Sequence, residues 1–158
     1  MRIVEEKIYT FEELNDSAKE TAREWWKDSM DYFWWKDSYE SIRVFCNEFN
    51  VKIRDYQIGA FSPSYLDTDA ENHLFRGLKL KDYKRDYMPT GYCLDCTLWE
   101  TFYDTWKETS DPLGAFNEAI DKAVRDIVND MEYQYSDEAV DEMLIINNYE
   151  FTEDGKRY

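Results

Sequence analysis

The stretch from Pro112 to Met131 constrains the fold most, because its apolar residues recur at intervals of three and four positions. One side of a helix built from it carries Phe116, Ala119, Ile120, Ala123, Ile127, Val128 and Met131. The other side carries Glu118, Asp121, Arg125, Asn129 and Asp130. This spacing predicts an amphipathic α-helix that must bury one face against other elements. Asp111 is placed to cap it, and Pro112 suits the first helical position because its missing N–H is not needed there.

Four other segments predict helices by the same reasoning. The first begins at Asn15-Asp16-Ser17, where a short side-chain oxygen can accept from a free backbone N–H. Its stripe consists of Ala18, Ala22, Trp25, Trp26, Ser29 and Phe33. A second helix from about Asp37 carries Tyr39, Ile42, Phe45, Cys46 and Phe49, and a third carries Leu94, Leu98, Phe102 and Trp106. Ser136 caps a short last helix with Val140, Met143 and Leu144.

Strand signals are fewer. The alternation of side chains typical of a strand is clearest over residues 51–59, and a first strand is expected within residues 3–11. Residues 62–92 form an irregular segment, in which alternating leucines allow one more strand at 74–80. The Asp154-Gly155 pair suits a tight hairpin turn, since glycine accepts a positive φ without steric cost. The sequence therefore predicts an α+β fold with four to five helices packed on a small antiparallel sheet, as a single domain over residues 1–158.

The composition excludes several classes of protein. Of the 158 residues, 18% are aromatic, which supplies enough apolar area for a core and argues against disorder. No stretch approaches the roughly 20 apolar residues of a membrane span, and no secretory signal is visible at the N-terminus. Three cysteines, an odd number, argue against a disulfide framework and for a reducing compartment. We expect a cytoplasmic protein.

The net charge of −16 is unevenly placed along the chain. Residues 1–94 carry a net charge of −4, whereas residues 95–154 hold 17 acids and only three bases. From Asp126 to Asp154 there are ten acids and no Lys or Arg. Such repulsion disfavours direct nucleic-acid binding and is usually tolerated for solubility or for a cationic partner.

Catalytic motifs are not evident. Cys93 and Cys96 could form a zinc site with Cys46 and His73, but a single CxxC more often marks two cysteines at the start of a helix. Paired carboxylates are frequent, yet only one histidine is available to partner them, and no phosphate-binding or nucleophile-elbow glycine motif occurs. We assign no catalytic residue, metal ligand or cofactor and expect no enzyme. A metal-dependent enzyme remains one alternative to a binding protein.

Two pairs of tryptophans and an acidic stretch remain as candidate binding surfaces. Trp25-Trp26 and Trp34-Trp35 fit a core with a half-exposed rim, or a protein interface, better than a stacking platform for bases, whose phosphates this chain would repel. The acidic candidates are Asp121, Asp126, Asp130, Glu132, Asp137, Glu138, Asp141 and Glu142. If helical, residues 126–142 present about one charge per 3.4 Å, close to the phosphate density along one DNA strand. A solvated acidic face is the plainer alternative.

Two stretches, one at each end of the chain, carry a further signal: residues 8–14, Ala18-Lys19 and residues 22–26 at the start, and residues 147–155 at the end. They resemble the two ends of a group of small uncharacterised phage-encoded proteins. The resemblance covers about a quarter of the chain and implies a phage origin with expression in a bacterial host, without transferring any catalytic residue. Small acidic phage proteins include inhibitors of restriction enzymes and CRISPR effectors, some of which imitate DNA.

Beside the metal-dependent enzyme, these observations lead to one main hypothesis and one further alternative. The chain is expected to be an anti-restriction or anti-CRISPR protein whose eight acids imitate phosphates on the basic nucleic-acid-binding surface of a host defence complex. The alternative is an interaction module that does not imitate DNA and acts through its aromatic helices or the basic segment 76–85.

Overall fold

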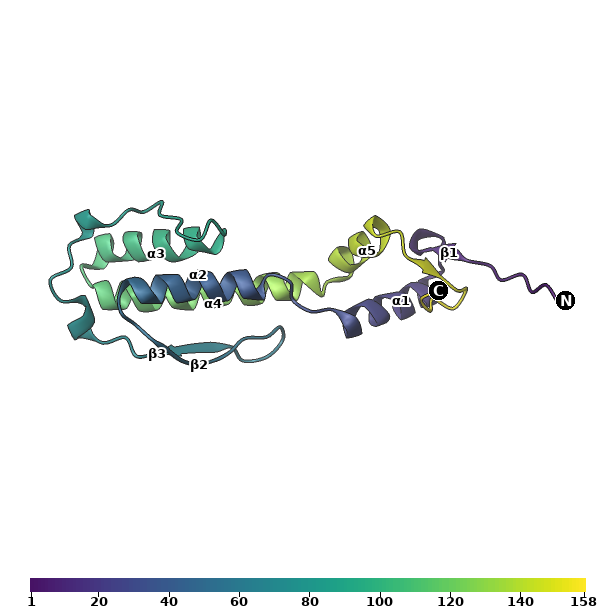
Figure 1. Ribbon diagram of the computed structural model, residues 1–158, viewed down its shortest axis with the longest axis horizontal. Coiled ribbons are helices and arrows are strands. Elements are labelled where there is room, and N and C mark those ends of the chain that lie inside the picture. Colours follow the sequence, from purple (N-terminus) through teal and green to yellow (C-terminus); the bar gives the residue numbers. More distant parts are fainter. The chain divides into compact units, whose positions relative to one another are not determined.

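The computed structural model describes residues 1–158 as five α-helices, two separate two-stranded antiparallel sheets and three short 3-10 helices (Figure 1). The α+β class is confirmed, although two small sheets stand in place of the one expected. By its internal contacts the chain divides into two compact units. One unit is residues 32–131, and the other joins residues 1–31 to residues 132–158.

The 32–131 unit is built around aromatic rings from its helices. It contains α2 (Trp35–Glu48), α3 (Leu94–Thr109) and most of α4 (Pro112–Gln134). The ring of Phe45 lies in the middle of this core, with its centroid 4.9 Å from that of Trp99 and 5.1 Å from that of Phe116. The predicted apolar stripe of α4 is confirmed, because all of its members are buried except the half-buried Val128.

A β-hairpin packs beside these helices. Strands β2 (Ile53–Gln57) and β3 (Tyr65–Thr68) pair antiparallel, with Gln57 opposite Tyr65. The strand expected over residues 51–59 is therefore confirmed in its central part, and Ser62-Pro63-Ser64 lies in the hairpin loop.

The further strand expected over residues 74–80 is wrong. Two 3-10 helices, Asn72–Phe75 and Leu80–Asp82, occupy this region instead. Gly77 between them has φ 76°, a left-handed conformation that does not continue an extended strand and that glycine adopts readily. The apolar residues of the segment serve the core, since Phe75 is buried with its ring 5.3 Å from that of Phe49.

A buried carboxylate holds the end of segment 62–92 against α3. Asp95 is fully buried, and its Oδ2 accepts from the Thr90 backbone N (2.9 Å), the Thr90 hydroxyl (2.8 Å) and the Gly91 backbone N (3.1 Å). Asp95 lies in the first turn of α3, where the helix dipole favours a negative charge. These donors and the dipole offset part of the cost of burying the carboxylate, whose other oxygen, Oδ1, is buried without a hydrogen-bond partner.

The second unit packs α1 (Asp16–Ser29) against α5 (Asp137–Ile146) and a short ladder. Strand β1 (Tyr9–Thr10) pairs with β4 (Glu150–Phe151). Its buried core consists of Phe11, Leu14, Ala18, Ala22, Val140, Leu144 and Phe151. Both predicted caps are confirmed: Asn15 Oδ1 accepts from the Ala18 N–H (2.9 Å), and the Ser136 hydroxyl accepts from the Ala139 N–H (3.3 Å).

Two predictions for this unit need correction. The first strand does not extend back to Ile3, which is 79% exposed, and after Thr10 the chain turns into a 3-10 helix, Phe11–Glu13. Glu13 Oε2 accepts from both the Thr10 backbone N–H (2.8 Å) and the Thr10 hydroxyl (3.0 Å), which favours that turn over a longer strand. Phe33 is 71% exposed and does not belong to the α1 stripe, because α1 ends at Ser29.

Gly155 is fixed by a close approach between two chain segments. It has φ 84° in the turn predicted at Asp154-Gly155, where the Gly155 N–H donates to the carbonyl of Thr152 (2.9 Å). A Cβ added to Gly155 would lie 2.0 Å from the carbonyl oxygen of Ala18 in α1. The turn can therefore rest on α1 only if residue 155 has no side chain.

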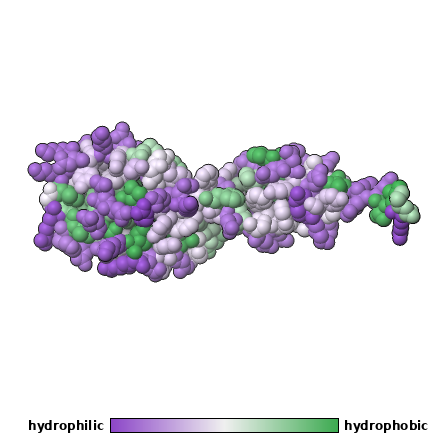
Figure 2. Space-filling model, viewed as in Figure 1, coloured by the Kyte–Doolittle hydropathy of each residue, from purple (hydrophilic) through white to green (hydrophobic).

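The face of the molecule shown in Figure 2 is mainly hydrophilic, and hydrophobic residues occupy small, separate areas among the hydrophilic ones. No helix is both long enough and apolar enough to cross a membrane.

Gly155→Ala should destabilise the protein by more than the about 1–3 kcal/mol of backbone strain alone, because the new methyl group also collides with the backbone of α1. Urea unfolding followed by circular dichroism measures the change. Gly77→Ala is the matched control, since Gly77 also has a positive φ but no atom within 4 Å of the added Cβ. Equal losses in the two variants would contradict the close approach.

Phe45→Ala should lower the free energy of unfolding by about 3–5 kcal/mol, the range for removing a large aromatic side chain from a packed core. The control is Phe33→Ala, which should change it by less than about 0.5 kcal/mol because Phe33 is 71% exposed. Denaturant titration of both variants gives the comparison, and a small loss for Phe45→Ala would mean that its ring cluster is not the centre of the core.

Candidate functional site

Helix α5 gathers four of the eight acidic candidates on adjacent turns. Asp137 and Asp141 are four residues apart, as are Glu138 and Glu142, so each pair forms one row along the helix. The two rows have different surroundings. Asp141 is half-buried, whereas Glu138 and Glu142 are exposed.

The row formed by Asp137 and Asp141 is neutralised by cations from α1. Arg23 binds Asp141 through two contacts, Nε to Oδ1 at 2.7 Å and Nη2 to Oδ2 at 2.8 Å. Lys27 Nζ lies 2.9 Å from Asp137 Oδ1, and this hydrogen bond holds the pKa of Asp137 below its ordinary value. The expectation that this acidic stretch is uncompensated is therefore wrong for these two residues, because the compensating cations come from a helix more than 100 residues away.

Glu138 and Glu142 form the row whose carboxylates are not neutralised. Both are exposed, and neither makes an ion pair. Glu132, also among the candidates, is half-buried in the last turn of α4. The exposed row is the part of the predicted stripe that can meet a partner as free negative charge.

The whole 1–31/132–158 unit likewise has more exposed carboxylates than cations to pair with them. It holds 17 acids and seven bases, a net charge of −10, and 15 of the acids are exposed. Five of the bases contact the unit itself. Arg23, Lys27 and Lys156 pair with carboxylates, and Lys19 and Arg157 lie over the rings of Phe11 and Tyr149. Most cationic side chains of the unit thus contact its own residues, whereas most of its carboxylates are exposed to solvent.

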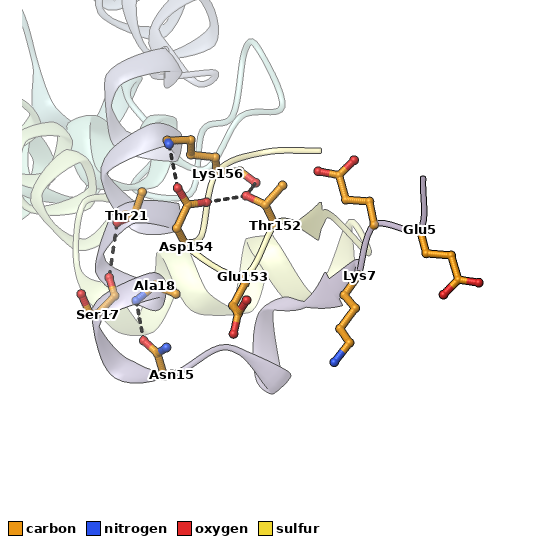
Figure 3. A pocket seen from close by; sticks show the side chains of 11 residues that line it. Glu5, Lys7, Asn15, Ser17, Ala18, Thr21, Thr152, Glu153, Asp154 and Lys156 are labelled. Carbon is orange, nitrogen blue, oxygen red and sulfur yellow. Dashed lines mark hydrogen bonds and ion pairs between the residues drawn. The ribbon is translucent and has the colours of Figure 1, made fainter. Parts of the chain in front are cut away.

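A wide hollow of about 1050 Å³ in this unit is also acidic at its rim. Figure 3 shows Asp154 between Lys156 and Thr152, with Glu153 and Glu5 on other parts of the wall. Asp154 accepts from Lys156 Nζ (2.6 Å) and the Thr152 hydroxyl (2.6 Å), which lowers its pKa to about 2. This carboxylate orders the turn before Gly155.

The other three candidates lie on α4 within the 32–131 unit. Asp121 is exposed. Asp126 Oδ2 accepts from the Thr97 hydroxyl (2.9 Å), with Lys122 Nζ 3.4 Å from its Oδ1. Asp130 Oδ2 accepts from the Tyr32 hydroxyl at 2.5 Å. The eight predicted residues therefore fall into two groups, one in each compact unit, and Asp126 and Asp130 are half-buried.

Asp126 and Asp130 lie in a cleft of about 530 Å³ that the sequence did not reveal. Its wall also includes Trp34 and Tyr92, which come from two segments far apart in the chain. Burial, followed by the hydrogen bond to Asp130, raises the pKa of Tyr32 far above its ordinary value. Tyr32 therefore stays a neutral donor to Asp130. No local pattern marks Tyr32 or Tyr92, because only the packing of α2, α3 and α4 brings them to this cleft.

The four residues considered for zinc do not come together. Cys46 is buried, and burial raises the pKa of its thiol to about 12. Cys93 is exposed, and Cys96 Sγ lies 3.7 Å from the sulfur of Met88. His73 is exposed beside Glu71. No group of three or more His, Cys, Asp or Glu side chains is placed to hold a metal ion.

The alternative surfaces are partly used within the fold. In the basic segment 76–85, Arg85 is engaged by Asp104 through two contacts of 2.8 and 3.0 Å. Trp25 and Trp26 are half-buried against Tyr149, with ring centroids 5.3 and 5.7 Å away. Of the four paired tryptophans, Trp34 is the exposed one.

Lys27→Met should raise the pKa of Asp137 toward its ordinary value of 3.8, because the variant loses the hydrogen bond and charge that hold it low. A lowered carboxyl pKa stabilises the fold above the ordinary pKa, and this contribution disappears as the pH falls through the lowered value. The stability difference between wild type and variant should therefore vanish in acid. Carboxyl NMR titration measures the pKa, and Lys19→Met, which removes a cation from the same helix, should leave Asp137 unchanged.

Comparison with known proteins finds no relative: no protein-family model, no curated protein and no solved structure matches this chain.

Proposed function

We propose that this chain is a phage anti-defence protein that acts in the cytoplasm of a bacterial host. It is a stoichiometric inhibitor, not an enzyme, and it occupies the basic nucleic-acid-binding surface of a restriction or CRISPR complex. The observation that supports this most is the 1–31/132–158 unit, which has a net charge of −10 and whose cations mostly bind its own side chains.

The physical basis is charge complementarity. A nucleic-acid-binding groove is lined with Lys and Arg, so a surface of exposed carboxylates is attracted to it and competes with phosphates. Because Arg23 and Lys27 are held in ion pairs within the unit, few free cations remain on it to repel such a groove. Association should be fast at low ionic strength and slow as salt is added.

The residues of α5 have two separate roles in this proposal. Glu138 and Glu142 face solvent and act as the phosphate-like groups. Asp137 and Asp141 instead tie α5 to α1 through Lys27 and Arg23, which holds the exposed row in place. The mimicking surface is thus smaller along α5 than the sequence suggests, but it is carried on a fixed helix.

The double variant Glu138→Lys/Glu142→Lys should bind a basic defence complex on the order of tenfold more weakly, equivalent to about 1.4 kcal/mol. Two assays measure this. One is competition with duplex DNA for a purified restriction or CRISPR complex at two salt concentrations. The other is the plating efficiency of a sensitive phage on bacteria that carry the system and express the chain.

The matched control is Asp67→Lys/Glu108→Lys, which changes the net charge equally at two exposed positions of the other unit. It should retain most of the inhibition. If wild-type binding is indifferent to salt, or if the α5 variant protects the phage as well as wild type does, the acidic-mimic proposal is wrong.

A further inference from the structure

The cleft in the 32–131 unit combines three kinds of surface. Its floor is apolar, formed by the buried Leu94 and Ile127. Its wall carries the aromatic rings of Trp34 and Tyr92, and the carboxylates of Asp126 and Asp130 also line it. The volume of about 530 Å³ lies within the usual range of ligand pockets, about 300–1,000 Å³.

The two carboxylates are oriented by hydroxyl groups, which leave their charge in place. Thr97 donates to Asp126 and Tyr32 donates to Asp130, each through one oxygen, Oδ2. The only cation near either group is Lys122, 3.4 Å from Asp126 and itself exposed. Asp130 forms no ion pair with a Lys, Arg or His side chain. The two residues are four positions apart on α4, a rise of about 6 Å, so one ligand can approach both.

Part of the aromatic wall is open to solvent. Trp34 is 49% exposed, and its ring stacks on Tyr92 with centroids 6.3 Å apart and an angle of 22° between the planes. The face of an indole ring attracts cations through its quadrupole, more strongly than the faces of the other aromatic side chains. An exposed indole beside two carboxylates, one of which (Asp130) has no ion-pair partner, therefore favours a positive ligand.

We propose that this cleft binds an organic cation with an apolar stem, of the alkylguanidinium or alkylammonium class. The stem lies on Leu94 and Ile127, the charged group reaches Asp126 and Asp130, and Trp34 covers it. A planar guanidinium suits the site better than an ammonium, because it stacks on a ring and donates to two carboxylates at once. An anion or a nucleotide would meet repulsion, and a neutral apolar ligand would strip water from the carboxylates without pairing them.

This site is independent of the acidic surface proposed for α5. It lies in the other compact unit and shares no residue with the exposed row of Glu138 and Glu142. Two sources can supply the same chemistry, a free guanidine or amine and the arginine or lysine side chain of a protein.

Binding of N-butylguanidinium to the full chain, followed by NMR chemical shifts and Trp fluorescence, tests the proposal. The neutral probe N-butylurea has nearly the same shape and is the ligand control. Asp130→Asn keeps an oxygen that can accept from Tyr32 and removes the charge, so it should weaken guanidinium binding about tenfold while preserving the fold. Trp34→Ala, at an exposed position, should weaken it similarly.

Glu118→Gln is the protein control, since it removes an exposed acid of the same helix outside the cleft. Its affinity for N-butylguanidinium should equal that of wild type. The Glu138→Lys/Glu142→Lys variant should also bind normally, which separates this site from the proposed inhibitory function. The proposal is overturned if N-butylurea binds as well as the cation, if Glu118→Gln loses as much affinity as Asp130→Asn, or if no cation binds.

Two peptides identify the source of the cation. One places a single arginine between glycine and serine residues, and the other replaces that arginine with citrulline, its neutral isostere. Tighter binding of the arginine peptide than of N-butylguanidinium, lost with citrulline, supports a protein side chain as the ligand. Equal or tighter binding of the free cation supports a small molecule.

Discussion

The packing of the Phe116 ring is the interaction on which the 32–131 unit depends. Phe116 is fully buried and stacks on Phe45 of α2 with an angle of 10° between the rings. The centroid of its ring also lies 5.7 Å from that of Phe49 and 5.4 Å from that of Phe75, which belongs to a 3-10 helix. One side chain of α4 thus joins α2 and the irregular segment into a single core. Without that core the cleft would lose its floor and the alignment of its walls.

The placement of the charged side chains follows from the cost of burying them. Almost no carboxylate is placed inside, and the exception, Asp95, receives three hydrogen bonds and a helix dipole. In the 1–31/132–158 unit, Arg23 and Lys27 of α1 form ion pairs with Asp141 and Asp137 of α5. That arrangement stabilises a small unit of high net charge and leaves its outer surface negative.

Much of the secondary structure could be read from local patterns. The α4 stripe, the caps at Asn15 and Ser136, and the turn at Asp154-Gly155 all depend on residues within one or two turns of each other. Predictions failed where the local signal was ambiguous. Alternating leucines over 74–80 resembled a strand, yet Leu74 and Leu80 belong to two 3-10 helices on either side of Gly77.

The candidate site was predicted only in part, for a related reason. The sequence showed which residues were acidic, but charge along a chain does not reveal what comes near in space. Arg23 lies 118 positions from Asp141, and Tyr32 lies 98 positions from Asp130. The first pair removes charge from the predicted stripe, and the second draws a predicted surface acid into a cleft.

By itself the sequence determined the α+β class, the positions and buried faces of most helices, and a large negative charge. These follow from periodicity, capping chemistry and composition, which act over short distances or over the chain as a whole. Only the tertiary structure decided which carboxylates stay free on α5, which are neutralised by α1, and which join Trp34 and Tyr92 in one cleft. Those outcomes depend on contacts between residues far apart in the chain, because the electrostatic state of a carboxylate is set by the atoms around it.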